Sequence, residues 1–164
     1  MTPWSVAEMR IQGKQIMRAL VLMGIVGGQR AMTPLAAVSI AAWRGELAKD
    51  NGAPAILARP TVAAATLALA IAEMAGDKQK TAPDRIVPIG LTARFITAAV
   101  AGMALAPQRD RWAAAAIGGV TAVVASYPGW RLRMAAMADH GQTPTGFIED
   151  AAVVTTAVAI IRRR

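Results

Sequence analysis

The sequence has no cysteine and only one histidine, His140, which excludes a disulfide framework and a thiolate metal site. Aromatic residues make up 4% of the chain and charged residues 17%. There is no HExxH pair and no Ser-His-Asp order around a nucleophile elbow, and GGQR at residues 27–30 lacks the lysine and the spacing of a P-loop. We therefore expect no enzyme and no cofactor, and the sequence leaves the metal content unknown.

Apolar residues are abundant instead. They account for 55% of the 164 residues, and the mean hydropathy is +0.40. Much of this fraction is alanine, which buries little area per residue and contributes little to a water-excluded core. Because a soluble domain of this length uses less apolar surface, we expect a lipid bilayer as the main partner. A soluble alanine-rich bundle is a minor alternative.

The chain is strongly basic, with a formal net charge of +8. Its lysines and arginines lie between apolar blocks and are not interleaved with aromatic residues on which bases could stack. This distribution favours contacts with anionic lipid head groups, so we expect no nucleic-acid partner. Basic residues flank nearly every block, and the sequence therefore predicts no membrane orientation.

Five apolar blocks predict the helices. They lie near residues 16–43, 61–76, 87–106, 112–130 and 147–161, with residues 1–14 as an interfacial segment and residues 44–60 as a loop. YPG at residues 127–129 interrupts the fourth block, and the fifth is short for a span unless the preceding TPTG joins it. The expected fold is all-α, a single transmembrane domain over residues 1–164 forming a polytopic bundle of four to five spans.

Small residues recur at four-residue spacing, which lets helices approach closely in lipid. The pairs are Gly24 with Gly28, Ala98 with Gly102, and Ala115 with Gly119. Such faces fit a homo-oligomer or docking on a larger membrane complex.

Arg30 lies inside the first apolar block, after Gly27 and Gly28 and before Pro34, so we expect the helix to be kinked or broken there. An arginine at the centre of a bilayer costs roughly 2.5–3.5 kcal/mol on insertion scales and normally faces a partner or a cavity. Arg94 poses the same problem in the third block. We expect both arginines to pair with acidic groups inside the bundle, namely Glu73 and either Glu149 or Asp150. The alternative is that both lie near the interfaces and snorkel.

The acidic residues occur in two pairs. Glu73 and Asp77 share one helical face near a helix end, where the dipole disfavours anions, so they need compensation from Lys78, Lys80, an arginine of another span, a bound cation or a proton. Glu149 and Asp150 follow Thr145, a candidate N-cap, and would then lie where the dipole favours anions.

Two segments resemble each other within the chain. GGQRAMTPLAA at residues 27–37 and GLTARFITAAVAG at residues 90–102 both place a glycine shortly before an arginine, then a threonine and small residues. An acidic cluster follows each segment, which suggests an internal repeat of the kind that builds transporter folds.

These motifs, with AEMAGDKQKTAPDRI in the middle and TPTGFIEDAAVVTTAVA at the end, resemble a family of small bacterial integral membrane proteins, domain of unknown function four-one-two-six. The resemblance covers nearly the whole chain. The matching positions are Gly28, Arg30, Pro34, Glu73, Asp77, Lys78, Arg94, Glu149 and Asp150. It implies a multi-pass helical protein of the bacterial inner membrane and supplies no activity.

EMAGDK at residues 73–78 is also similar to the acidic signature of cation/proton exchangers that move manganese or calcium, whose helix carboxylates bind the ion. One extra residue separates Glu73 from Gly76 here, and FIED at residues 147–150 has no glycine or lysine after it.

The leading functional hypothesis is a transporter or channel for an ion, a proton or a small solute. In it Arg30 and Arg94 bind or gate an anionic group, and Glu73, Asp77, Glu149 and Asp150 carry a cation or a proton. The alternative is a non-transporting membrane subunit or scaffold whose charge pairs only fix helix packing.

Overall fold

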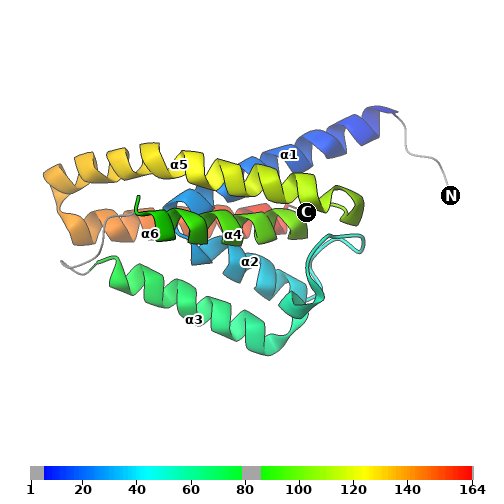
Figure 1. Ribbon diagram of the computed structural model, residues 1–164, viewed down its shortest axis with the longest axis horizontal. Coiled ribbons are helices and arrows are strands. Elements are labelled where there is room, and N and C mark those ends of the chain that lie inside the picture. Colours follow the sequence, from blue (N-terminus) through cyan, green and yellow to red (C-terminus); the bar gives the residue numbers. More distant parts are fainter. Residues whose placement is uncertain (1–5, 79–85, 164) are drawn as a thin grey trace.

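The computed structural model describes residues 6–78 and 86–163, and in those residues all regular structure is helical (Figure 1). The prediction of an all-α fold is therefore confirmed. The elements are α1 (Val6–Gln29), α2 (Met32–Trp43), η1 (Ala55–Ala58), α3 (Pro60–Gly76), α4 (Pro88–Ala104), η2 (Gln108–Asp110), α5 (Arg111–His140) and α6 (Gln142–Arg162).

Proline and glycine set several of the helix ends. α3 begins at Pro60 and α4 at Pro88, where the missing N–H and the fixed φ of proline suit a first helical turn. Gly141 has φ +81° and joins α5 to α6, a left-handed conformation that glycine adopts without steric cost.

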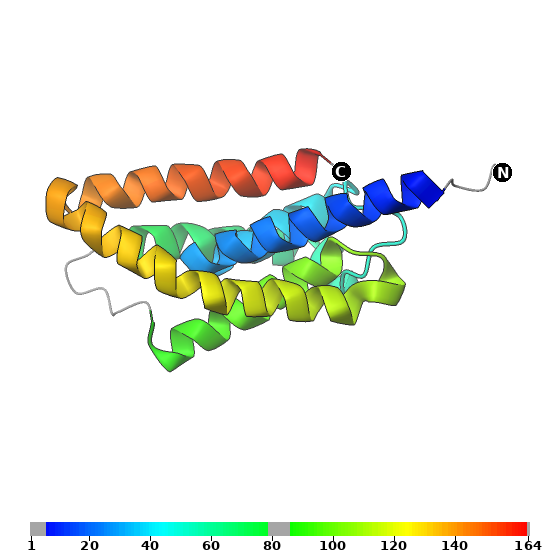
Figure 2. The same cartoon turned by 90° about the horizontal axis from the view of Figure 1, so that it is seen from above.

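The first apolar block is broken at Arg30, as predicted, but its two halves do not cross the bundle in line. α1 runs inward from the N-terminus, and after residues 30 and 31 α2 turns back toward the end from which α1 came (Figures 1 and 2). We call this pair the α1–α2 hairpin. Its two residues between helices form the tip, and both are buried.

The two ends of the bundle differ. At one end, which we call the linker end, the α2–α3 and α4–α5 linkers are joined by hydrogen bonds from Gly52 N to Ala106 O at 2.8 Å and from Gln108 N to Asp50 O at 2.7 Å. The start of α1 and the end of α6 lie at this end too (Figure 2). At the opposite end, α3 ends and α5 turns into α6. We call it the cluster end, after the group of charged side chains described below.

Small residues let α5 approach its neighbours closely. A Cβ atom on Gly24 of α1 would lie 2.6 Å from the Thr121 side chain, and one on Gly28 would lie 2.8 Å from Ala122 O. A Cβ atom on Gly118 would lie 2.6 Å from Ala98 O of α4. The small-residue pairs noted in the sequence therefore serve packing within the chain, which weakens their use as evidence for docking on another protein.

Two local predictions were wrong, those for YPG and for Thr145. YPG does not interrupt α5, which continues through Pro128 to His140. Residues from Val6 onward belong to the continuous helix α1, while residues 1–5 lie outside the described part of the chain, so an interfacial location of the first segment stays a prediction. Thr145 is not an N-cap, because α6 begins at Gln142 and the Thr145 hydroxyl donates to Gly141 O at 2.8 Å inside the first turns.

The two segments of the expected internal repeat differ in local structure. Residues 27–37 span the break between α1 and α2, whereas residues 90–102 lie inside the continuous helix α4. A duplication receives no support from this part of the fold.

Within the described residues, α6 is the one helix whose length and composition would let it cross a membrane unaided. α2, α3 and α4 are apolar but shorter. TPTG does join the last helix and extends it to 21 residues, the condition under which the fifth block was expected to be long enough.

Candidate functional site

Arg30 lies at the tip of the α1–α2 hairpin and is the centre of a buried group of charges. Its side chain is 1% exposed. Its Nε donates to Asp150 Oδ1 of α6 at 2.7 Å, and its Nη2 lies 2.9 Å from Asp77 Oδ2 and 3.4 Å from Glu149 Oε2. One guanidinium thus faces three carboxylates from the end of α3 and from α6.

Arg133 of α5 is a second cation in the same group, and the sequence interpretation missed it. Its side chain is 7% exposed, and its Nη1 lies 2.7 Å from Asp77 Oδ2 and 2.6 Å from Glu149 Oε2. Its Nη2 also donates to Asp77 O at 3.1 Å. Asp77 and Glu149 are therefore each shared between the two arginines.

Lys78 is the third cation. Its ammonium group forms an ion pair with Asp150 Oδ2 and donates to Met74 O at 2.9 Å. It also lies 4.5 Å from the centre of the Phe147 ring, a favourable cation–π distance. Lys78 was one of the compensating groups that the sequence suggested for the acidic pair at the end of α3.

We call Arg30, Asp77, Lys78, Arg133, Glu149 and Asp150 the tip cluster. It has three cationic and three anionic side chains, so its formal charge is zero. The two arginines are the deepest members, while the carboxylate side chains of Asp77, Glu149 and Asp150 are 12–15% exposed. Such mutual pairing is what a low-dielectric interior requires of charged groups.

Glu73 does not pair with Arg30, contrary to the prediction. Its two carboxylate oxygens accept hydrogen bonds from Ala31 N at 2.7 Å and Met32 N at 2.8 Å. These are the free N–H groups at the start of α2, where the helix dipole also favours an anion. Through these two hydrogen bonds, Glu73 connects the tip of the α1–α2 hairpin to α3.

Arg94 is buried on α4, so it does not snorkel to bulk water, and neither does Arg30. The ion pairs that define the tip cluster do not include Arg94. Lys80, another compensating group suggested by the sequence, lies outside the described residues.

The geometry bears on which solute could bind. The Arg30 guanidinium already faces three carboxylates, so this side chain is engaged with anionic groups of the chain itself. In the described ranges, no three acidic, cysteine or histidine side chains are grouped as ligands for a metal ion. Glu73 is engaged by backbone N–H groups and Asp77 by arginines, so the EMAGDK segment does not present its carboxylates together.

No protein-family model, no curated protein and no solved structure matches this chain. The family resemblance carried by the motifs accordingly stays a prediction.

Proposed function

We propose that this protein is a multi-pass helical protein of the bacterial inner membrane and that it moves a proton or a small cation on the carboxylates of the tip cluster. The observation that carries the proposal is the distribution of side chains. Arg30 is the largest of the fully buried side chains, while large apolar residues are exposed on α1, α3, α4, α5 and α6.

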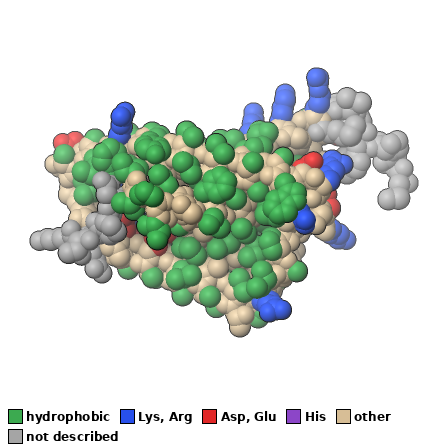
Figure 3. Space-filling model, in the orientation of Figure 1, with side chains coloured by type: hydrophobic (Ala, Val, Ile, Leu, Met, Phe, Trp, Pro, Cys, Tyr) green, Lys and Arg blue, Asp and Glu red, His purple; other side chains and the backbone are tan. Residues whose placement is uncertain are grey.

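The outer surface supports placement in lipid. Leu67, Leu69 and Ile71 of α3 are exposed, Leu69 to 53%, in a helix that carries no charge between Pro60 and Ala72. Figure 3 shows apolar side chains spread over the middle of one face, with lysines and arginines mainly toward the linker end. A water-soluble monomer rarely exposes so large a contiguous apolar surface.

The helix lengths suggest a topology of four spans and one re-entrant hairpin. α6 has 21 residues and α3 and α4 have 17 each, about 32 Å and 25 Å at 1.5 Å per residue, against a hydrocarbon core of about 30 Å. α2 has 12 residues, about 18 Å, and would return to the side from which α1 entered. Non-helical backbone at membrane depth is tolerated where protein surrounds it, as at the buried tip.

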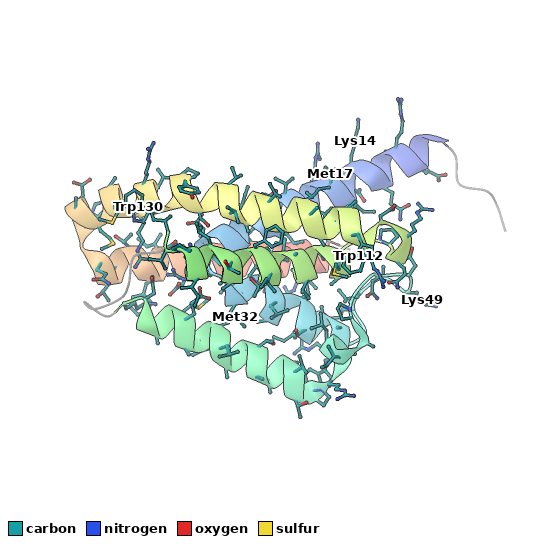
Figure 4. All side chains as sticks on the ribbon, viewed as in Figure 1. Lys14, Met17, Met32, Lys49, Trp112 and Trp130 are labelled. Atoms are coloured by element: carbon teal, nitrogen blue, oxygen red, sulfur yellow. The ribbon has the colours of Figure 1, made fainter. Side chains whose placement is uncertain are left out.

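Charge distribution suggests an orientation that the linear sequence did not. Many basic residues belong to described segments at the linker end: Arg10, Lys14, Arg18, Arg44, Lys49, Arg59, Arg109, Arg111, Arg162 and Arg163. Lys14, Lys49 and Trp112 can be followed at this end in Figure 4, with Trp130 toward the other. Described segments at the cluster end hold Lys78, Arg131 and Arg133. By the positive-inside rule we place the linker end in the cytoplasm.

Transport is supported by the position of the tip cluster at the break of a re-entrant hairpin. Ionisable groups inside a membrane bundle are rare and commonly mark proton or ion pathways, and broken helices commonly form the ion sites of transporters. The three carboxylates of the cluster are 12–15% exposed, whereas Arg30 and Arg133 are 1% and 7% exposed, so the carboxylates are more open to an approaching cation or proton than the arginines are.

A second candidate is a non-transporting membrane subunit, and one observation favours it. The tip cluster is electrically balanced and each of its charges has a partner, as a purely structural network would have.

Proton flux into liposomes separates the two candidates. Purified protein is reconstituted with a trapped pH-sensitive dye, and a potassium diffusion potential is applied. We expect flux above that of empty liposomes, loss of that flux in Asp77→Asn, and retention in Asp139→Asn, which removes an exposed acid at the same end. If protons do not move, the same liposomes are tested with sodium or potassium gradients. Wild-type protein that carries none of the three ions would leave the structural subunit as the better account.

A further inference from the structure

A cavity of about 590 Å³ lies at the linker end, far from the tip cluster. Its walls come from α1 and α6, and residues of the α2–α3 and α4–α5 linkers complete it. No residue of the tip cluster lines it. The volume lies within the range of about 300–1,000 Å³ that is usual for small-molecule sites.

The lining carries both charge and apolar surface. Arg18 of α1 and Arg163, directly after α6, contribute two guanidinium groups, and Asp50 contributes one carboxylate, so the formal charge of the lining is +1. Gln12 and Gln15 add amide groups that can donate hydrogen bonds. The lining therefore matches an anionic ligand that also carries hydrogen-bonding oxygens.

The rest of the lining is apolar and continues onto the outer surface. Ile16, Leu22 and Ile160 belong to the cavity. Leu22 is 45% exposed, and its neighbours Val21 and Ile25 on α1 are exposed as well. Through Leu22 the cavity adjoins exposed apolar residues of α1, which face lipid in the proposed placement. A small soluble anion would gain nothing from contact with these apolar side chains, whereas an acyl chain can bury its apolar surface against them.

We propose that the cavity between α1 and α6 binds one anionic phospholipid. Arg18 and Arg163 hold the phosphate, Gln12 and Gln15 donate to head-group oxygens, and an acyl chain leaves along Leu22 into the surrounding lipid. The charge of the lining complements a head group of charge −1, such as phosphatidylglycerol, better than the neutral head group of phosphatidylcholine. This inference rests on the proposed membrane location and is independent of transport.

Native mass spectrometry of the full chain in an uncharged detergent tests the proposal. Phosphatidylglycerol, phosphatidylcholine and glycerol phosphate are titrated separately. We expect one phosphatidylglycerol to bind with clear preference over phosphatidylcholine. Binding should weaken by roughly fivefold in Arg18→Gln and again in Arg163→Gln, since each basic residue near a membrane surface contributes about 1 kcal/mol. Lys14→Gln, which removes an exposed cation from the same helix end outside the cavity, should bind as wild type does.

Asp50→Asn keeps the test decisive if an arginine variant does not fold. It raises the charge of the lining from +1 to +2 and should tighten phosphatidylglycerol binding. The proposal is overturned by equal binding of the two lipids, by equal loss in Lys14→Gln, or by glycerol phosphate binding as well as the lipid. Each of these results leaves the membrane location intact, whereas protein that stays monodisperse without detergent would overturn that location itself.

Discussion

Replacing Arg30 with glutamine removes the cation that three carboxylates share. Among the described residues, the cations that face Asp77, Glu149 and Asp150 would then be Lys78 and Arg133, so the tip cluster would hold three anionic and two cationic side chains. Removing one partner of a buried ion pair costs about 3–5 kcal/mol. For a chain of this length, each kcal/mol lowers the unfolding midpoint by about 2–4 °C, so we expect a fall of roughly 10 °C.

The assay is thermal unfolding of purified protein in mixed detergent and lipid, with two companion variants. Arg30→Gln combined with Asp150→Asn restores the charge balance and should recover about 1 kcal/mol or more. Arg44→Gln removes an exposed arginine whose nearest acid, Glu46, is 3.8 Å away, and should change stability by less than about 0.5 kcal/mol. The reasoning is refuted if Arg30→Gln is as mild as Arg44→Gln, or if the double variant is no more stable than the single one.

Three further predictions concern packing, capping and orientation. Gly118→Ala should destabilise the protein by about 1–3 kcal/mol, because the new Cβ would lie 2.6 Å from a backbone carbonyl oxygen of α4. Gly13→Ala is the control: a Cβ there would have no atom within 4 Å, so it should be neutral or slightly stabilising in the same unfolding assay. Glu73→Ala should lower the stability of the fold by about 1 kcal/mol, because two N–H groups at the start of α2 lose their acceptor. Glu73→Gln should lower it less, because its amide oxygen still accepts a hydrogen bond. Equal losses of stability in the two variants would contradict the capping role. Because the chain has no native cysteine, single introduced cysteines report the membrane orientation. Asp139→Cys should react with a membrane-impermeant maleimide in intact cells, whereas Lys49→Cys should react only after the cells are lysed. The reverse pattern would invert the proposed topology.

Much of the helix pattern could be predicted because its signals are local. Pro60 and Pro88 begin helices, and the glycines before Arg30 precede a break. The direction of α2 after that break could not be predicted, since it depends on Glu73, more than 40 residues away in the chain, which accepts hydrogen bonds from the first N–H groups of α2. A contact of that kind leaves no mark in the spacing of neighbouring residues.

Arg133 was missed because YPG was treated as the end of an apolar helix. Pro128 lies inside α5, and the helix continues past it to His140. Ala122, Ser126 and Arg133 then fall on one buried face, at helical spacings of four and seven residues. Following that periodicity through the proline would have placed Arg133 toward the carboxylates of α6.

The central claim, that charged side chains lie inside a bundle whose outside faces lipid, is tested most directly by spin-label accessibility. Nitroxides are attached to Leu69→Cys on the exposed apolar side of α3 and to Lys49→Cys in the α2–α3 linker, with the protein in lipid vesicles. The account predicts that oxygen relaxes the label at residue 69 far more than a water-soluble nickel chelate does, and that the label at residue 49 shows the opposite. Equal access of the nickel chelate to both labels would contradict the claim.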